Sequence, residues 1–316
     1  MRIGFIGLGN VGYKLANSLL EEGFELIIHD LEKKKADPFI AKGAKWAKSP
    51  AELSLEAEGI ITCLPSPGVV REVMEGELGV LSSITSGKIW IEMSTTDDQE
   101  MKRIANRVKE KGANVIEAPV SGGCHRAATG QISIFVGGDR EAFEKALPVL
   151  SCIGYKILHV GPIGSASILK VVTNFLASTH LVALGEALMV CKKAGIDLKK
   201  AFEGIKISSG NSFVHETESQ VIMNGSYNIN FTLDLVCKDV GLFKNLSETY
   251  GVPTEISKKI FDIFEEGRKE FGDRAWSSMI VKRIENHCKT NLRADGFPIE
   301  LEDHSKRQKG YEIITD

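Results

Sequence analysis

The feature that most constrains the fold is a glycine pattern close to the start of the chain. Gly7, Gly9 and Gly12 form a GxGxxG that follows a short apolar stretch and precedes an amphipathic one. A second apolar stretch ends near Asp30, at about the 20-residue interval where dinucleotide-binding βαβ units carry an acidic residue. A glycine turn in an unrelated α/β fold is the alternative, but this context predicts a Rossmann-type strand–turn–helix that binds a dinucleotide.

The residues of the glycine loop and those after the second apolar stretch are expected to bind the cofactor and to select between NAD and NADP. A carboxylate at Asp30 would accept hydrogen bonds from the adenosine ribose and repel a 2′-phosphate, which favours NAD over NADP. Lys33, Lys34 and Lys35 keep NADP open as an alternative, since a bent loop would bring them to a 2′-phosphate. The expected cofactor-binding residues of the loop are Gly7, Leu8, Gly9, Asn10, Val11 and Gly12.

The first half of the chain alternates short apolar runs with amphipathic segments, which is typical of a parallel sheet covered by helices. Strands are predicted at Arg2–Ile6, Glu25–His29, Gly59–Cys63, Lys88–Glu92, Ala113–Glu117, Ile132–Val136 and Lys156–Val160. Helices are predicted at Asp97–Lys111 and Glu141–Leu150. We therefore expect an α/β Rossmann-type N-terminal domain over residues 1–162.

Beyond this domain only helical patterns follow. A long interdomain helix is predicted from Gly164 to about Lys193, closed by Gly195, and further helices at Leu233–Tyr250 and Glu255–Arg268. We expect an all-α C-terminal domain over residues 163–288 that binds substrate and forms oligomers. Residues 289–316 are polar and weakly periodic, so they are expected to be a tail that is either mobile or packed on a partner subunit.

The long helix contains an apolar stretch, Val171–Val190, that is long enough to cross a membrane. Asn174, His180 and Glu186 lie within it, and each of these polar groups would be costly in lipid. A helix buried in protein is therefore the better interpretation, and no membrane partner is predicted. Glycines interrupt the apolar N-terminal run, so we expect no secretory signal and a cytoplasmic protein.

Composition excludes several other classes. The formal net charge is −3, and no basic stripe with interleaved aromatic residues is present, which argues against a nucleic-acid partner. The six cysteines form no CxxC and no close pair, and the seven histidines form no HExxH. The sequence therefore predicts a reducing compartment and no metal site.

Further motifs follow the glycine loop in a fixed order. They are Leu64-Pro65, Met93-Ser94-Thr95-Thr96, Glu117-Ala118-Pro119-Val120-Ser121-Gly122-Gly123, Gly161-Pro162-Ile163-Gly164 with Lys170 and Asn174 downstream, and Leu233-Asp234-Leu235-Val236-Cys237-Lys238-Asp239. A hydroxyl followed by two unhindered backbone N–H groups, as in Ser121-Gly122-Gly123, is a compact receptor for a carboxylate. The i, i+4 spacing of Lys170 and Asn174 puts an ammonium and an amide on one helix face.

In this order the motifs resemble the β-hydroxyacid dehydrogenase family, the 3-hydroxyisobutyrate dehydrogenase-like enzymes, from Phe5 to about Glu285. The resemblance implies that Lys170 is the general acid/base and that Asn174 orients the substrate. Burial of Lys170 would favour the neutral amine that a base requires. A solvated surface charge is the alternative for a lysine at a helix start, although the surrounding sequence is apolar.

The resemblance also assigns binding roles. Ser121, Gly122 and Gly123 would hold the substrate carboxylate, and Phe231 would line the pocket. The cofactor would be contacted by Leu64, Pro65, Thr95 and Lys238. The alternatives are a helix N-cap for Thr95, a surface salt bridge for Lys238 and a core position for Phe231. Ala166 and Thr173 depart from the family pattern, which usually has glycine and asparagine there.

Related enzyme classes fit less well. None of the tyrosines has a lysine four residues later, as short-chain dehydrogenases require. 6-Phosphogluconate dehydrogenases are longer and carry His-Asn where this chain has Thr173-Asn174, and imine reductases usually lack the lysine. A catalytically silent dinucleotide-binding sensor or scaffold remains the alternative from another class. The predicted function is an NAD(P)-dependent oxidoreductase that interconverts a small β-hydroxy acid and its semialdehyde or keto acid, as a homodimer or homotetramer.

Overall fold

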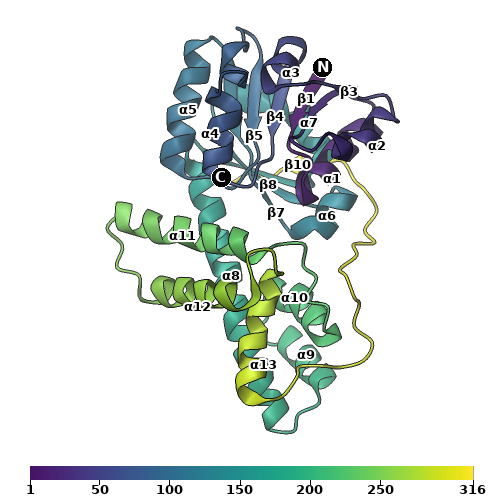
Figure 1. The fold of residues 1–316 in the computed structure, drawn as a ribbon, viewed down its shortest axis with the longest axis vertical. Helices are drawn as coiled ribbons and strands as arrows, with labels where there is room; N and C mark the ends of the chain where they lie inside the picture. Colours follow the sequence, from purple (N-terminus) through teal and green to yellow (C-terminus); the bar gives the residue numbers. More distant parts are fainter. Residues whose placement is uncertain (316) are drawn as a thin grey trace. The chain divides into compact units, whose positions relative to one another are not determined.

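The computed structural model describes residues 1–315, which form two compact units. Unit 1 consists of Met1–Lys170 together with Asp303–Asp316, and unit 2 of Val171–Glu302. The expected division after residue 162 therefore differs from the observed one, because the first turns of the long helix pack within unit 1. Figure 1 shows the elements of both units.

Unit 1 contains a single ten-stranded sheet. Its strands are β1 (Arg2–Ile6), β2 (Glu25–His29), β3 (Lys45–Trp46), β4 (Gly59–Thr62), β5 (Ile89–Glu92), β6 (Asn114–Glu117), β7 (Val120–Ser121), β8 (Ser133–Gly138), β9 (Lys156–Gly161) and β10 (Tyr311–Glu312). Every predicted strand is confirmed: Arg2–Ile6 and Glu25–His29 match at both ends, and the ends of the others differ by at most two residues. β3, β7 and β10 were not predicted, because two residues are too few to show a period.

The strand order is β10-β9-β8-β6-β5-β4-β1-β2-β3, with β7 paired to β8. From β3 to β6 all neighbours are parallel, whereas β8 runs antiparallel to β6 and β7. The expectation of a uniformly parallel sheet is therefore wrong at this point. The short connection through β7 and one small helix returns the chain beside β6 in the opposite direction, without the long crossover that a parallel pair needs.

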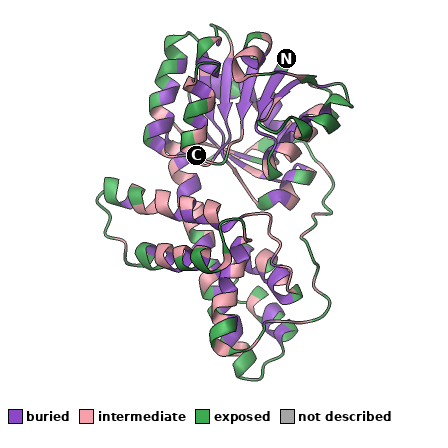
Figure 2. Cartoon of the chain, viewed as in Figure 1, coloured by how far each residue is buried: buried purple, intermediate pink, exposed green. Residues whose placement is uncertain are grey.

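Helices cover both faces of this sheet, as a buried parallel sheet requires. Within unit 1 the helices are α1 (Asn10–Glu21), η1 (Lys33–Ala36), α2 (Asp37–Ile40), α3 (Pro50–Glu56), α4 (Pro67–Glu75), η2 (Val80–Ser82), α5 (Asp98–Glu110), α6 (Gly123–Thr129) and α7 (Arg140–Ile153). Ile3 and Phe5 of β1 pack in one core cluster with α1 and α7, whereas Ile6 packs in another with α3, α4 and α5. Figure 2 shows the strands buried along most of their length.

The long helix α8 (Ser165–Lys193) begins in unit 1 and continues into unit 2. By length and composition it could cross a membrane: its most apolar window has a mean hydropathy of 1.4, and 33% of that window is buried. Core helices of soluble proteins pass the same test, so this is weak evidence for a span. The side chain of Asn174 is hydrogen-bonded inside unit 2, which favours packing in protein.

Unit 2 is helical, as predicted for the C-terminal domain. Besides α8 it contains α9 (Leu198–Lys206), α10 (Phe213–Asn224), α11 (Leu233–Thr249), α12 (Glu255–Phe271), η3 (Ser277–Val281) and α13 (Lys282–Cys288). Leu188, Val240 and Phe264, from α8, α11 and α12, are fully buried in its core. The helices predicted near residues 233–250 and 255–268 are confirmed.

The last residues do not form a separate tail. Leu292 is fully buried in the core of unit 2, and the Arg293 guanidinium pairs with Glu285. From Asp303 the chain belongs to unit 1 again, where β10 adds a parallel strand beside β9. The expectation of a free or partner-bound tail thus differs from the structure. The reason is that an edge strand is held by main-chain hydrogen bonds, which side-chain polarity does not reveal.

Candidate active site

The glycine loop between β1 and α1 has the geometry that a dinucleotide requires. Gly7 has a φ of +100°, and a Cβ there would lie 2.3 Å from the carbonyl oxygen of Cys63. A Cβ at Gly12 would lie 2.0 Å from the carbonyl oxygen of Gly7. Around Gly9, by contrast, a Cβ would meet no atom within 4 Å. Gly7 and Gly12 close the turn, and Gly9 leaves open space where a pyrophosphate can approach the backbone.

This difference gives the first prediction. Gly12→Ala forces a backbone clash and should cost about 2 kcal/mol or more of the free energy of unfolding. Gly9→Ala should leave the unfolding temperature unchanged but weaken dinucleotide binding by about tenfold, because the added methyl group occupies the ligand's space. Thermal unfolding and fluorescence titration with NADH and NADPH measure the two effects. A lowered unfolding temperature in Gly9→Ala together with the weaker binding would contradict the assignment of Gly9 to the pyrophosphate site.

Asp30 has a structural part beside the one expected for it. Its Oδ2 accepts a hydrogen bond from the backbone N–H of Leu8 at 2.7 Å, and its Oδ1 accepts one from Glu32 at 2.9 Å. The Lys35 ammonium lies 3.7 Å from the same carboxylate. Asp30 therefore fixes the glycine loop directly, and Lys35 offsets part of its charge. Lys33 and Lys34 are exposed.

The expected residues of two further loops lie at the carboxyl ends of neighbouring parallel strands. Leu64 and Pro65 follow β4, and Thr95 follows β5. The two loops are joined, because the N–H of Leu64 donates to Ser94 Oγ at 2.8 Å. The alternative of a helix N-cap at Thr95 is wrong: α5 is capped by Asp97, whose side chain accepts from the N–H of Glu100.

Sequence reasoning gave no role to Glu92, a fully buried carboxyl group at the end of β5. Thr62 Oγ1 donates to its Oε2, and the N–H of Ser94 donates to its Oε1, both at 2.6 Å. Burial raises the pKa of Glu92 to about 7, although hydrogen bonds from Ser94 and Thr62 act against this shift. Glu92 therefore links the two loop-bearing strands through a group that titrates near neutral pH.

The second prediction concerns the pH dependence of stability. Because the folded state holds the Glu92 proton up to about pH 7 and the unfolded chain loses it near pH 4.5, stability falls as the pH rises through this window. The difference is worth about 3 kcal/mol. Glu92→Gln keeps an acceptor but cannot ionise, so its free energy of unfolding should fall less than that of the wild type.

Urea unfolding at about pH 5 and about pH 8 measures this fall. Glu110→Gln, the same chemical change on an exposed face of α5, is the control and should behave as the wild type. An identical fall in Glu92→Gln and in the wild type would show that Glu92 is not responsible.

The Ser-Gly-Gly segment lies where β7 turns into α6. Ser121 pairs with Ser133 of β8, and Gly122 and Gly123 have φ values of +130° and +84°. Such values are rare outside glycine, so the two glycines are required for the turn itself. Ser121 and Gly122 are half-buried and Gly123 is exposed, which keeps the loop accessible to a small ligand.

A second buried carboxylate, Glu117 at the end of β6, holds the start of α8. It accepts hydrogen bonds from the N–H groups of Gly164 at 2.7 Å and Ala166 at 2.8 Å, and from the hydroxyl of Ser167. Burial raises the pKa of Glu117, while these hydrogen bonds act in the opposite direction. Lys170 follows one turn after Ser167 and is 8% exposed. A charged residue ending an apolar strand was the available signal for both glutamates.

In unit 2 the expected residues lie on α8 and α11. Asn174 Nδ2 donates to Asp239 Oδ2 at 2.6 Å, and the Lys238 ammonium lies 2.7 Å from Asp239 Oδ1. Asp239 is 2% exposed, so the pair is not the exposed surface salt bridge considered as the alternative for Lys238. Phe231, just before α11, packs against the core of unit 2.

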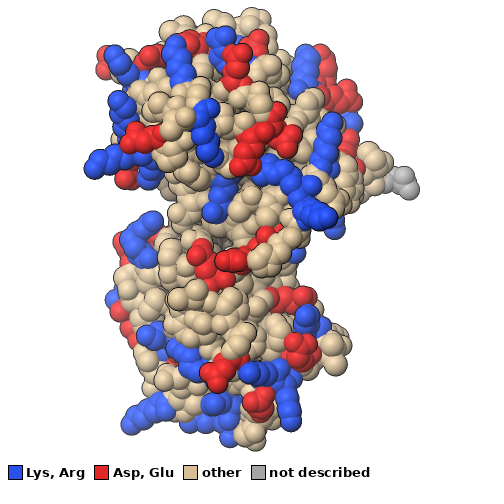
Figure 3. Space-filling model, turned by 90° about the vertical axis from the view of Figure 1, so that its right-hand side faces the viewer, with Lys and Arg blue, Asp and Glu red and all other residues tan. Residues whose placement is uncertain are grey.

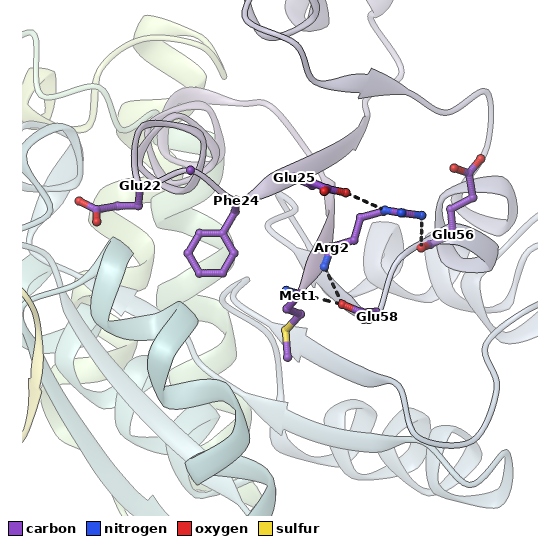
Figure 4. Close-up of a pocket in the computed structure, with 8 residues that line it drawn as sticks. Met1, Arg2, Glu22, Phe24, Glu25, Glu56 and Glu58 are labelled. Atoms are coloured by element: carbon purple, nitrogen blue, oxygen red, sulfur yellow. Dashed lines mark hydrogen bonds and ion pairs between the residues drawn. The ribbon is translucent and has the colours of Figure 1, made fainter.

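A pocket of about 550 Å³ lies elsewhere on unit 1 (Figure 4). Arg2 at its centre pairs with Glu25 and bonds the backbone oxygen of Glu56, and Glu58 accepts from the N–H of Arg2. β1 and β2 begin at this pocket, so it lies at the amino-terminal ends of these strands, whereas the glycine loop follows the carboxyl end of β1. It is therefore not the cofactor site.

The arrangement of metal-ligating and charged side chains bears on two other kinds of site. No three His, Cys, Asp or Glu side chains among residues 1–315 are grouped to hold a metal ion. All six cysteines are free thiols. On the face drawn in Figure 3, basic and acidic side chains are interspersed.

Comparison with known proteins agrees with this geometry. Residues 2–161 match the family model of the NAD binding domain of 6-phosphogluconate dehydrogenase, and residues 164–284 that of the NAD-binding region of NADP-dependent 3-hydroxyisobutyrate dehydrogenase. The 2-(hydroxymethyl)glutarate dehydrogenase of Eubacterium barkeri is 35% identical over 89% of this chain and 94% of its own. Mouse mitochondrial 3-hydroxyisobutyrate dehydrogenase is 32% identical over 83% and 80%. The crystal structure of 3-hydroxyisobutyrate dehydrogenase from Salmonella typhimurium has a TM-score of 0.82 and 25% identity, over 90% of this chain and 99% of that one.

Proposed function

Because the chain belongs to the β-hydroxyacid dehydrogenase family of NAD(P)-dependent enzymes, we propose that it interconverts a small β-hydroxy acid and its semialdehyde or keto acid with Lys170 as general acid/base. The observation that carries the proposal is the burial of Lys170 on a helix whose first turn is fixed by Glu117. Desolvation favours the neutral amine, and a fixed helix start holds the amine in one place.

In the oxidation direction, Lys170 Nζ takes the proton of the substrate hydroxyl as the carbon that bears this hydroxyl becomes a carbonyl carbon. In the reduction direction, the ammonium returns this proton to the carbonyl oxygen. NAD or NADP, when bound at the glycine loop, supplies the hydride-transfer chemistry. The residues that would hold the dinucleotide are Gly7 to Gly12, Asp30, Leu64, Pro65, Thr95 and Lys238.

The substrate carboxylate is assigned to Ser121, Gly122 and Gly123. The hydroxyl of Ser121 and the two glycine N–H groups are all donors, and a carboxylate accepts charge-assisted hydrogen bonds from such groups. Asn174 is assigned to orient the reacting oxygen. Asp239 supports this assignment, because it accepts from Asn174 Nδ2 and so fixes which way the amide points. Phe231 is proposed to line the pocket.

The relatives suggest a substrate class. 3-Hydroxyisobutyrate and 2-(hydroxymethyl)glutarate both carry a hydroxymethyl group on the carbon next to a carboxylate. We therefore favour a 2-(hydroxymethyl) acid, whose oxidation gives a semialdehyde. We favour NAD as cofactor, because the Asp30 carboxylate would repel a 2′-phosphate. A homodimer or homotetramer in the cytoplasm is the proposed form.

A panel of acids tests the proposal. 3-Hydroxyisobutyrate, 2-(hydroxymethyl)glutarate, glycerate and L-serine are each assayed with NAD and with NADP by absorbance of the reduced nicotinamide. The matched controls are the methyl esters, which keep the hydroxyl but remove the negative charge. We expect steady turnover of at least one acid and a much lower kcat/KM for its ester. No turnover of any acid would favour a silent dinucleotide sensor, and equal turnover of acid and ester would refute the carboxylate site.

A further inference from the structure

The last residues of the chain form a segment that both family models leave out, since the second model ends at residue 284. We call residues 303–312 the C-terminal strap. It belongs to unit 1, although the residues just before it belong to unit 2. In Figure 1 it is the yellow segment that ends in β10.

One end of the strap is seated tightly. The N–H of Gly310 donates to the carbonyl oxygen of Ser151 at 2.8 Å, and β10 then pairs with β9. A Cβ at Gly310 would lie 2.0 Å from the carbonyl oxygen of Gly154, so only glycine fits. The Arg140 guanidinium contacts both carboxylate oxygens of Glu312, at 2.5 and 2.8 Å. These contacts anchor the strap as an added edge strand.

The other end of the strap touches α6 and α1. Asp303 accepts a hydrogen bond from the hydroxyl of Thr129, the last residue of α6. Gln131 Nε2, just beyond α6, donates to the carbonyl oxygen of Lys306 at 3.2 Å. The Arg307 guanidinium donates to Ser18 Oγ on α1 at 2.8 Å. The strap therefore ties the end of α6 to the helix that follows the glycine loop.

The opposite end of α6 is the Ser-Gly-Gly segment. α6 runs from Gly123 to Thr129, about 10 Å along its axis, and its backbone hydrogen bonds connect one end to the other. Fixing Thr129 therefore limits how Gly122 and Gly123 can shift. Ser121 is held by its pairing with Ser133 of β8, whereas the two glycines have no side chains that could anchor them, so α6 supplies the restraint on their other side.

We propose that the C-terminal strap positions the carboxylate-binding segment Ser121–Gly123 through the Asp303–Thr129 contact, and thereby sets the affinity for the acid substrate. This inference rests on the proposed function. Asp303 and Thr129 are positioning residues, because they act through α6 and do not touch the substrate.

The charge of Asp303 supports its role as a positioning residue. Burial acts to raise the pKa of Asp303, but hydrogen bonds from Ser305 and Thr129 and the nearby His125 hold it below its ordinary value. The carboxylate is therefore ionised at neutral pH, which strengthens its hydrogen bond to the Thr129 hydroxyl. His125 lies in the first turn of α6. Burial lowers the pKa of His125, and so does Arg126, while Asp303 acts in the opposite direction.

The test compares Asp303→Ala, Thr129→Val and the double variant with the wild type. We expect KM for the acid to rise about five- to tenfold in each single variant, because only part of the free energy of the lost Asp303–Thr129 hydrogen bond is then needed to order the segment when the acid binds. The values of kcat and of Kd for NADH should stay near those of the wild type. The double variant should be no worse than either single variant, because both remove the same contact. Gln308→Ala, an exposed change on the strap, is the matched control and should leave KM unchanged.

Calorimetric titration of the acid into the NADH-saturated enzyme gives a second readout that does not need turnover. Weaker acid binding in the two variants with unchanged NADH binding supports the proposal. An unchanged KM with a lowered unfolding temperature would overturn it and leave the strap a purely stabilising element. A wild type that neither turns over nor binds any acid would overturn the proposed function, and this inference with it. A chain that ends at Glu302 should show the KM defect in full; if that chain does not fold, the point variants decide.

Discussion

Replacing Lys170 with methionine is expected to lower kcat by about a thousandfold, the range of a lost general acid/base. Methionine keeps most of the length and apolar stem of lysine, so the buried position should stay packed. The dissociation constant for NADH should remain near that of the wild type, because the glycine loop is untouched. Steady-state kinetics and fluorescence titration on the same preparations measure both quantities.

Two further variants sharpen this test. Lys170→Ala leaves a space, so added methylamine should restore part of its activity in proportion to the concentration of free amine. Lys192→Met makes the same change at an exposed position on α8 and should leave kcat unchanged. Near-normal turnover by Lys170→Met across the whole acid panel would show that another group moves the proton.

Glu117→Ala is expected to cost about 3 kcal/mol or more of the free energy of unfolding, because it leaves three donors without their acceptor inside the protein. It should also lower kcat strongly, since the freed helix start carries Lys170. Glu117 is fully buried and packs against Gly137, where a Cβ would lie 2.2 Å from its Oε1. Chemical unfolding and steady-state kinetics measure the two losses.

Ser167→Ala removes one of the donors to Glu117 and leaves the carboxylate in place. It removes a hydroxyl while Glu117 keeps its two N–H donors, so it should cost only about 1 kcal/mol. Glu117→Gln can still accept hydrogen bonds at its one amide oxygen, so its loss in the free energy of unfolding should lie between those of Glu117→Ala and Ser167→Ala. For this folded variant we expect kcat to fall while Kd for NADH is kept. A loss in Glu117→Ala no larger than that in Ser167→Ala would mean that the carboxylate does not hold the start of α8.

Much of the fold follows from local pattern. The strand β1, the glycine loop and the helix α1 were predicted with their observed order, because alternating apolar runs and a GxGxxG report directly on local geometry. The helical second unit was also predicted, since a run of helical periods needs no knowledge of distant residues. The reversal of β8 was missed, because strand direction depends on which strand becomes the neighbour.

The site shows the same division. The glycines and the position of Lys170 were visible in the sequence as motifs. The buried carboxylates Glu92 and Glu117 were not assigned, because a lone glutamate after an apolar run does not reveal which N–H groups it will meet. Gly164 lies 47 residues beyond Glu117, and only the folded chain brings them together.

The dinucleotide loop, the succession of strands along the chain and the residue types available for catalysis are readable from local sequence, since each depends on neighbours a few positions apart. That Asp30 fixes the glycine loop, that Glu117 holds the start of α8 and that Tyr311–Glu312 form an edge strand is visible only in the folded chain. Each of these contacts joins residues far apart in the chain. Hydrogen bonding and burial at such distances are set by the packed whole, and no local pattern encodes them.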